Sequence, residues 1–285
     1  MSRKSVAPAR TKLGNRRVTG KEQYYTPREL ASSLVSKVER IVSDFSSRTV
    51  LEPAGGTGAF VEAAKAAGAK KVLSVDIEPK HGDVNKGDYL STNLKLSNAV
   101  TISNPPFGRN NSLSIPFFNR AADHSEYIAF IVPRSWRKWS VINRLDRRFH
   151  LIHDEDLSID YVDDTHTLIS QKNNLKTCFQ IWKRQDHLRE IVKVEDRGFV
   201  TKVKPAEADI ALTVFGFSCG RVNTEFERKA NTTRMFLKLN HPGALKALQT
   251  ANFQRFSKNT AYTEALSFQE INFLLNEALG NKTNK

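Results

Sequence analysis

The stretch Leu51-Glu52-Pro53-Ala54-Gly55-Gly56-Thr57-Gly58-Ala59-Phe60 decides the fold that this sequence predicts. A short apolar run, 49–51, precedes the glycines and an alanine-rich helical segment, 59–67, follows them, so they occupy a strand-to-helix turn. Without Cβ atoms, such a turn lets a ligand approach the backbone amides at the start of the helix. Because many tight turns use glycine structurally, the neighbouring residues have to decide between the two readings.

Short apolar segments alternate with helical ones on both sides of this turn. Pro27 opens a helix with Leu30, Leu34, Val38 and Ile41 on one face, and strands are expected at 71–77, 99–103 and 127–132. This alternation predicts an α/β fold with a doubly wound, mostly parallel sheet. Further strands are expected at 151–159 and 177–182, and residues 190–260 read as a smaller module packed on the sheet.

Three carboxylates accompany the glycine turn in a meaningful order. Asp76 ends the next predicted strand, where an acid typically bonds ribose hydroxyls, and Asp88 follows it, where an acid can accept from an adenine amino group. Glu52 lies directly before the glycines, where it would repel a diphosphate and attract a cation. The set favours S-adenosylmethionine, which carries a sulfonium and an ammonium group, over a dinucleotide.

The segment Ser103-Asn104-Pro105-Pro106-Phe107-Gly108 follows the strand 99–103 and is the second chemical signal. Two prolines stiffen it and lack N–H donors. The Asn104 side-chain oxygen and the Pro105 carbonyl can accept the two hydrogens of a nucleobase amino group and direct its lone pair at a sulfonium methyl. Phe107 can stack on the base, which is worth roughly 1–3 kcal/mol. The alternative is an ordinary proline-rich turn at a strand end.

The ordered set resembles the amino-directed DNA methyltransferases, specifically the mostly phage or bacterial adenine-N6 enzymes in which a glycine motif precedes NPPF or NPPY. Tyr24-Tyr25-Thr26-Pro27 looks like the segment that precedes the glycine motif in that family. The resemblance covers about residues 22–135. It implies a Rossmann-like methyltransferase fold, and it implies that Asn104, Pro105, Pro106 and Phe107 hold the target base. The cofactor contacts that we expect are Tyr25, Thr26, Glu52, Pro53, Ala54, Gly55, Gly56, Gly58, Asp76, Ile77, Asp88, Tyr89 and Asn104.

On this basis the chain divides into three parts. Residues 1–21 form a basic arm, 22–188 a methyltransferase catalytic domain, and 189–285 a small module where the family places its target-recognition region. The arm carries seven basic side chains and no acid, which fits either phosphate binding or a solvated tail.

The formal net charge of +14 favours a polyanionic partner, and nucleic acid is the commonest one. Basic residues and tryptophans interleave in 133–150, which begins at the ligand-binding edge of the predicted sheet. Helical spacing would place Arg137, Arg144 and Arg148 on one face, with Leu145 and Phe149 against the core. The residues expected to contact nucleic acid are Arg134, Trp136, Arg137, Lys138, Arg144 and Arg148. The alternative is a solvated amphipathic helix with core tryptophans.

The remaining features indicate a soluble, cytoplasmic protein of a bacterium or a phage-infected cell. Cys178 and Cys219 form no CxxC pair, which suits a reducing compartment and predicts neither a disulfide nor a zinc site. His150, His153 and His166 stand among acids without metal-ligand spacing, so we expect no metal. No apolar stretch is long enough for a membrane span.

The sequence favours transfer of a methyl group to N6 of adenine in DNA and leaves three alternatives open. An RNA adenine-N6 methyltransferase would use the same chemistry. A protein glutamine methyltransferase has a similar tetrapeptide, although it usually has Tyr where Phe107 stands, and +14 suits that substrate poorly. A catalytically silent nucleic-acid-binding subunit would need neither the glycine turn nor the tetrapeptide intact.

Overall fold

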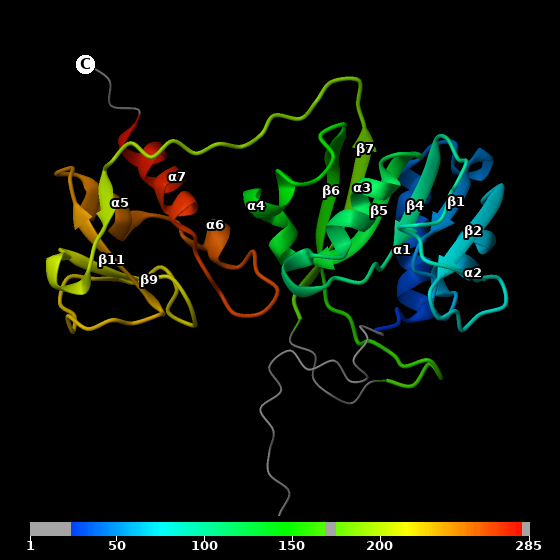
Figure 1. Cartoon of the computed structure of the whole chain (residues 1–285), viewed down its shortest axis with the longest axis horizontal. Helices are drawn as coiled ribbons and strands as arrows, with labels where there is room; N and C mark the ends of the chain where they lie inside the picture. Colours follow the sequence, from blue (N-terminus) through cyan, green and yellow to red (C-terminus); the bar gives the residue numbers. More distant parts are fainter. Residues whose placement is uncertain (1–23, 169–174, 281–285) are drawn as a thin grey trace, which may run out of the picture.

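The computed structural model describes residues 24–168 and 175–280, so the basic arm predicted at 1–21 lies outside the described residues. A seven-stranded sheet with the order β3-β2-β1-β4-β5-β7-β6 forms the larger part (Figure 1). All strand pairs from β3 to β5 are parallel, and β7 runs antiparallel to both of its neighbours. This mostly parallel sheet confirms the predicted fold class. The strands are β1 Thr49–Glu52, β2 Lys71–Asp76, β3 Asn85–Lys86, β4 Ala99–Ser103, β5 Ser125–Pro133, β6 Phe149–Leu157 and β7 Thr177–Arg184.

Helices cover both faces of this sheet because alternate residues of its central strands point to opposite sides. Ala129 and Ile131 of β5 pack with α1 and α2, whereas Ile128, Phe130 and Val132 pack with α3 and the turn after β5. The predicted helix after Pro27 is confirmed as α1, with Leu34 and Val38 buried. The helices of this part are α1 Arg28–Ile41, η1 Phe45–Ser47, α2 Ala59–Ala66, η2 Arg109–Asn111, α3 Ser114–Ala121, η3 Arg134–Arg137 and α4 Trp139–Ile142.

A second, antiparallel sheet with the order β10-β9-β11-β8 follows in the chain. Its own apolar core joins the sheet to α5 and α7, and an extended segment links it to β7 (Figure 1). The elements are β8 Val200–Lys202, η4 Pro205–Glu207, β9 Ile210–Thr213, β10 Val222–Asn223, β11 Arg234–Leu239, α5 Ala244–Thr250, α6 Gln254–Ser257 and α7 Phe268–Leu279.

The two sheets are joined through the residues that follow β5. The Trp139 ring lies 5.2 Å from that of Phe256 and 5.1 Å from that of Phe273. Next to it, Lys138 Nζ donates to Glu270 Oε1 at 2.8 Å, and the Glu270 side chain is only 3% exposed. Glu270 also closes the capping box that begins α7 with Ser267. This contact fixes the second sheet relative to the carboxyl ends of the parallel strands.

Among the described residues, no helix is long and apolar enough to cross a membrane.

Candidate functional site

The glycine turn connects β1 to α2, as predicted, and two of its glycines have positive φ: +46° at Gly56 and +80° at Gly58. A Cβ on Gly56 would lie 2.7 Å from the Tyr25 ring, and one on Gly58 would lie 2.5 Å from the His81 ring. These missing Cβ atoms therefore make room for two side chains of the chain itself. The sequence interpretation gave a structural role of the glycines as the alternative to ligand binding, and it did not identify Tyr25 and His81 as the side chains that pack there.

Asp76 ends β2 beside this turn, at the predicted place. Its Oδ2 accepts from the Gly56 N–H at 2.9 Å, and its Oδ1 accepts from the Glu78 N–H at 2.8 Å. Oδ2 thus helps to hold the glycine turn and Oδ1 holds the loop that follows β2, and any ribose contact would use their remaining lone pairs. The next residue, Ile77, is 60% exposed and leaves an apolar side chain at the same edge.

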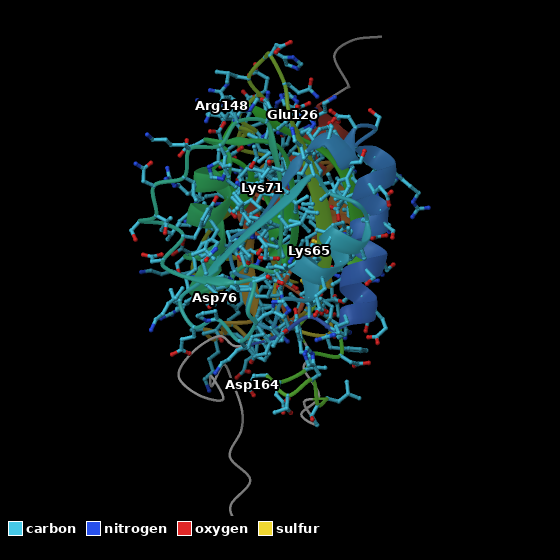
Figure 2. All side chains as sticks on the ribbon, turned by 90° about the vertical axis from the view of Figure 1, so that its right-hand side faces the viewer. Lys65, Lys71, Asp76, Glu126, Arg148 and Asp164 are labelled. Carbon is cyan, nitrogen blue, oxygen red and sulfur yellow. The ribbon has the colours of Figure 1, made fainter. Side chains whose placement is uncertain are left out.

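The surroundings of Tyr25 are acidic. Burial raises the pKa of Tyr25 to about 12, and the carboxylates of Asp76, Asp164 and Glu78 add to this shift. Lys80 is the basic partner of Asp164, at 3.5 Å. Clustered negative charge at the carboxyl ends of parallel strands attracts a cation and repels a phosphate. Figure 2 shows Asp76 and Asp164 toward the same end of the molecule, away from Glu126.

Glu52 is the most deeply buried acid of the site, with 2% of its surface exposed. Its Oε1 accepts from the Ala54 N–H at 2.9 Å and from the Ser103 hydroxyl at 2.6 Å, so it ties the end of β1 to the end of β4. Burial raises the pKa of Glu52 to about 8, against the opposing effect of these two hydrogen bonds. The neighbouring Pro53 and Gly55 are buried and Ala54 is half-buried.

Asn104 follows β4 and has a defined orientation. Its amide nitrogen donates to the Tyr24 carbonyl at 3.3 Å and to the Thr26 hydroxyl at 3.2 Å. Because a carbonyl can only accept, the nitrogen has to face Tyr24 and the oxygen has to face the other way. Asn104 Oδ1 is buried and has no hydrogen-bond partner within the described residues. Asn104 Oδ1 is therefore an acceptor that a water molecule or a ligand donor would satisfy.

The residues after Asn104 hold a compact turn. Pro105 is buried, while Pro106 and Phe107 are half-buried, and Phe107 packs against the core under α1 and α2. Gly108, with φ at +65°, lets the chain turn back, because a Cβ there would lie 2.5 Å from Ser112 Oγ. This packing against the core holds the Phe107 ring in place.

Tyr161 is a site residue that the sequence interpretation missed. Its ring lies 5.3 Å from that of Tyr24, it is 4% exposed, and its hydroxyl lies next to the Asn104 side chain. Burial raises the pKa of Tyr161, the Tyr24 and Tyr262 phenols add to the shift, and a hydrogen-bond interaction with the Asn104 side chain opposes it. The backbones of Tyr25 and Val162 pair beside it at 3.1–3.2 Å. No local motif signals this contact, because the partners lie far apart in the sequence.

Two predicted cofactor contacts need comment. Asp88 is exposed, and its Oδ1 accepts from the Leu90 N–H at 3.0 Å, so it shapes its own turn. The Tyr89 ring is 1% exposed, and its hydroxyl lies 3.1 Å from His124 Nε2. The expectation that the Tyr89 side chain contacts a cofactor is therefore corrected, because core packing keeps the ring away from the open edge.

The expected arginine face over 133–150 is wrong in its geometry. The segment contains two short helices, η3 and α4, followed by a turn, in place of the single helix that we expected. Trp136 is fully buried, and its indole N–H donates to Ser114 Oγ at 3.2 Å, so it is a core residue that cannot stack on a base. Leu145 and Phe149 are buried as predicted.

Most of the basic side chains in this segment are engaged with acids of the chain. Arg137 binds Asp154 through Nε at 2.9 Å and Asp156 at 2.7 Å, and Arg134 binds Asp156 at 2.9 Å. The two acids point the same way because they are two residues apart on β6. Arg148 binds Asp146 at 2.6 Å. Lys138 binds Glu270, as described above, which leaves Arg144 as the exposed member of the predicted set.

Arg148 is also at the wrong edge for the predicted role. Figure 2 shows it toward the same end of the molecule as Glu126, which lies at the amino end of β5, while Asp76 lies toward the opposite end. The chain has returned across the molecule between the end of β5 and the start of β6. The structure therefore does not present Arg137, Arg144 and Arg148 on one helical face.

The described residues contain no group of three or more His, Cys, Asp and Glu side chains that could hold a metal ion. His150 and His153 lie on β6 and His166 in the following loop. Both cysteines are free in the structure, and Cys178 is buried.

No protein-family model and no curated protein matches the sequence. Among solved structures, similarity is found to PH1948 of Pyrococcus horikoshii, which has a provisional assignment as an RNA methyltransferase (20% identity, TM-score 0.47, 61% of this chain and 94% of that one). The 23S rRNA methyltransferase ErmE has 13% identity and a TM-score of 0.39 over 60% of this chain and 72% of its own. A type I restriction-modification methyltransferase subunit from Streptococcus thermophilus has 13% identity and a TM-score of 0.41 over 57% and 45%. At these identities neither a substrate nor a residue's role carries over to this chain.

Proposed function

We propose that this chain is an S-adenosylmethionine-dependent methyltransferase that modifies N6 of adenine in DNA. The observation that carries the proposal is Asn104, whose Oδ1 is buried, oriented by two hydrogen bonds from its own amide nitrogen, and left without a donor among the described residues. An exocyclic amino group supplies the N–H donor that this oxygen lacks.

The residues at the edge also fit the proposed cofactor. When bound, S-adenosylmethionine supplies an electrophilic methyl group on a cationic sulfur. Asp76 and Glu78 contribute negative charge at this edge, and Asp164 is paired with Lys80; the acids suit the positive charges of that cofactor better than a diphosphate. Glu52 lies behind the turn as a buried carboxyl group that a nearby cation would help to ionise.

The chain's own groups then act on the target base mainly by positioning. Asn104 Oδ1 and the Pro105 carbonyl accept the two amino hydrogens, which biases the nitrogen toward a tetrahedral shape and frees its lone pair. The ring of Phe107, held by its packing, stacks on the base. In a duplex the adenine has to leave the stack to reach these groups, which costs a few kcal/mol.

A methyl-transfer assay tests the proposal. The protein and labelled S-adenosylmethionine are incubated in parallel with duplex DNA, single-stranded DNA, RNA and a bulk protein extract, with Asn104→Ala as the control. The products are digested and the modified unit is identified by mass spectrometry. N6-methyladenine from DNA is the expected product. Label in RNA or on glutamine would show that the substrate is RNA or protein and not DNA. No label despite intact cofactor binding would contradict the proposed enzyme activity.

A further inference from the structure

Three aromatic side chains near the second sheet are largely exposed to solvent. Phe217 is 103% exposed, Phe215 is 48% exposed and Tyr262 is 46% exposed. Phe215 and Phe217 lie in the loop between β9 and β10, and Tyr262 lies in the segment between α6 and α7, which loops toward the seven-stranded sheet (Figure 1). A fully exposed phenylalanine ring has its whole apolar surface in water, so covering it with a partner would be favourable.

The loop that carries Phe217 is well braced. Gly216 N–H donates to the Glu264 carbonyl at 3.0 Å, Cys219 N–H to the Gly216 carbonyl at 3.0 Å, and Gly220 N–H to the Thr213 carbonyl at 2.8 Å. Gly216 and Gly220 have φ values of +99° and +94°, and a Cβ on Gly220 would lie 2.9 Å from the Phe253 side chain. The backbone therefore holds Phe217 out into solvent in a defined position.

The three exposed rings connect to the candidate site. Phe215 forms a β-bridge with Ala265, which joins the loop to the segment that carries Tyr262. In turn, the Lys176 N–H donates to the Ala261 carbonyl at 2.7 Å, directly before β7 begins. The Tyr262 phenol acts on the pKa of Tyr161, which packs on Tyr24 beside Asn104. The segments that carry Phe215 and Tyr262 are therefore paired with each other, and the segment of Tyr262 also pairs with the residues before β7.

Charge favours one occupant for this aromatic row, defined as Tyr262, Phe215 and Phe217. Arg221 ends the Phe217 loop and Lys258 precedes Tyr262; both are exposed, and Lys176 is half-buried. Segments 213–221 and 258–266 together contain only one acid, Glu264. Separate rings with basic neighbours suit a strand of stacked bases and phosphates better than a continuous apolar partner.

We propose that the aromatic row is a stacking platform for unpaired bases of a DNA strand next to the adenine at Asn104. The inference rests on the proposed function for the choice of DNA. Each ring stacks on the face of a base and so holds a flanking strand open, while Arg221, Lys258 and Lys176 attract its phosphates. Stacking is tolerant of sequence because every base has an aromatic face, so the row adds affinity without selecting a site.

The test is a binding measurement that needs no turnover. Fluorescence anisotropy is used to titrate the full chain into a labelled DNA strand, its duplex and an RNA strand of the same sequence, without cofactor. Phe217→Ala should weaken binding of the DNA strand by on the order of 5- to 150-fold. Phe217→Trp should retain affinity, and the emission of its added indole should fall when the strand binds. Leu188→Ala, which removes a side chain that is 54% exposed outside the row, should bind like wild type.

Several outcomes would overturn the inference. Equal DNA-strand affinities of Phe217→Ala and wild type would do so, as would an equal loss for Leu188→Ala or no measurable binding of the DNA strand by wild type. A loss confined to RNA would overturn DNA as the occupant. Because the assay needs no methyl transfer, Phe217-dependent binding by a chain that transfers no methyl group would contradict the proposed function and leave the platform standing.

Discussion

The Thr26 hydroxyl accepts a hydrogen bond from the Asn104 amide at 3.2 Å and, together with the Tyr24 carbonyl, determines which way the Asn104 oxygen faces. The segment before α1 therefore orients a side chain that follows β4, 78 positions later. The Tyr24–Pro27 segment is therefore in direct contact with the tetrapeptide that begins at Asn104.

Thr26→Val tests this orientation. Valine keeps the shape of threonine and removes the acceptor, so Asn104 loses one of the two bonds that direct its oxygen. We expect single-turnover methyl transfer to fall by about 10- to 100-fold, the scale of a small misplacement in an active site. Cofactor affinity, measured by calorimetry on the same variant, separates this effect from the loss of a contact between Thr26 and the cofactor. Wild-type turnover in Thr26→Val would show that the Asn104 orientation does not depend on this bond.

Asp76→Asn should weaken binding of S-adenosylmethionine. Asparagine keeps one acceptor oxygen for the turn but removes the negative charge and one of the two oxygens that bind Gly56 and Glu78. Loss of a hydrogen bond to a charged group corresponds to roughly 10- to 150-fold in the dissociation constant. A calorimetric titration measures it, and Asp186→Asn, which changes an exposed acid after β7, is the matched control. An unchanged affinity in Asp76→Asn would remove Asp76 from the cofactor site.

Glu52→Gln should stabilise the protein increasingly as the pH rises. In the unfolded chain the Glu52 carboxyl ionises near the ordinary glutamate pKa of 4.5, whereas in the folded protein burial raises its pKa to about 8. Folding then opposes ionisation, so wild type loses stability between about pH 4.5 and pH 8, by on the order of a few kcal/mol. Glutamine keeps an acceptor for Ser103 and does not titrate. The difference in Tm between variant and wild type should grow across this window, and a constant difference would contradict the raised pKa.

Lys138→Met should destabilise the protein more than it weakens nucleic-acid binding. It would leave the buried Glu270 carboxylate without its basic partner, and breaking a buried pair costs about 3–5 kcal/mol. Urea unfolding measures the loss. Arg144→Ala, which removes an exposed side chain, should stay within about 0.5 kcal/mol of wild type. If Lys138→Met kept the stability of wild type and its DNA binding depended less on salt, Lys138 would be a phosphate-contacting residue, as the sequence predicted.

The sequence was sufficient where the signal is local. The apolar spacing of Leu34 and Val38 predicts α1, and the glycine turn predicts the junction of β1 with α2. Both follow from periodicities and turn residues within a few positions of each other. The doubly wound sheet follows from the alternation of such segments.

The sequence did not predict contacts between side chains that lie far apart in the chain. In the sequence, Arg137 lies among other basic residues and looks like a phosphate-binding residue. Only the three-dimensional placement of β6 shows that its guanidinium group binds Asp154 and Asp156. Tyr161 and His81 carry no motif, and their positions beside Asn104 and Gly58 depend on how the chain returns to the sheet edge. The alternation of Asp154 and Asp156 on a predicted strand is the one signal that could have indicated paired arginines.

The measurement that tests the central claim most directly is single-turnover methyl transfer by Asn104→Ala, with cofactor binding measured on the same preparation. Alanine removes the buried Oδ1 and leaves Glu52, Asp76 and the glycine turn in place. We predict that the variant binds S-adenosylmethionine like wild type and loses on the order of 10²–10³-fold in the rate of N6-methyladenine formation, the scale seen when one preorganised polar group is removed. A rate equal to that of wild type would contradict the assignment of Asn104 as the acceptor for the target amino group.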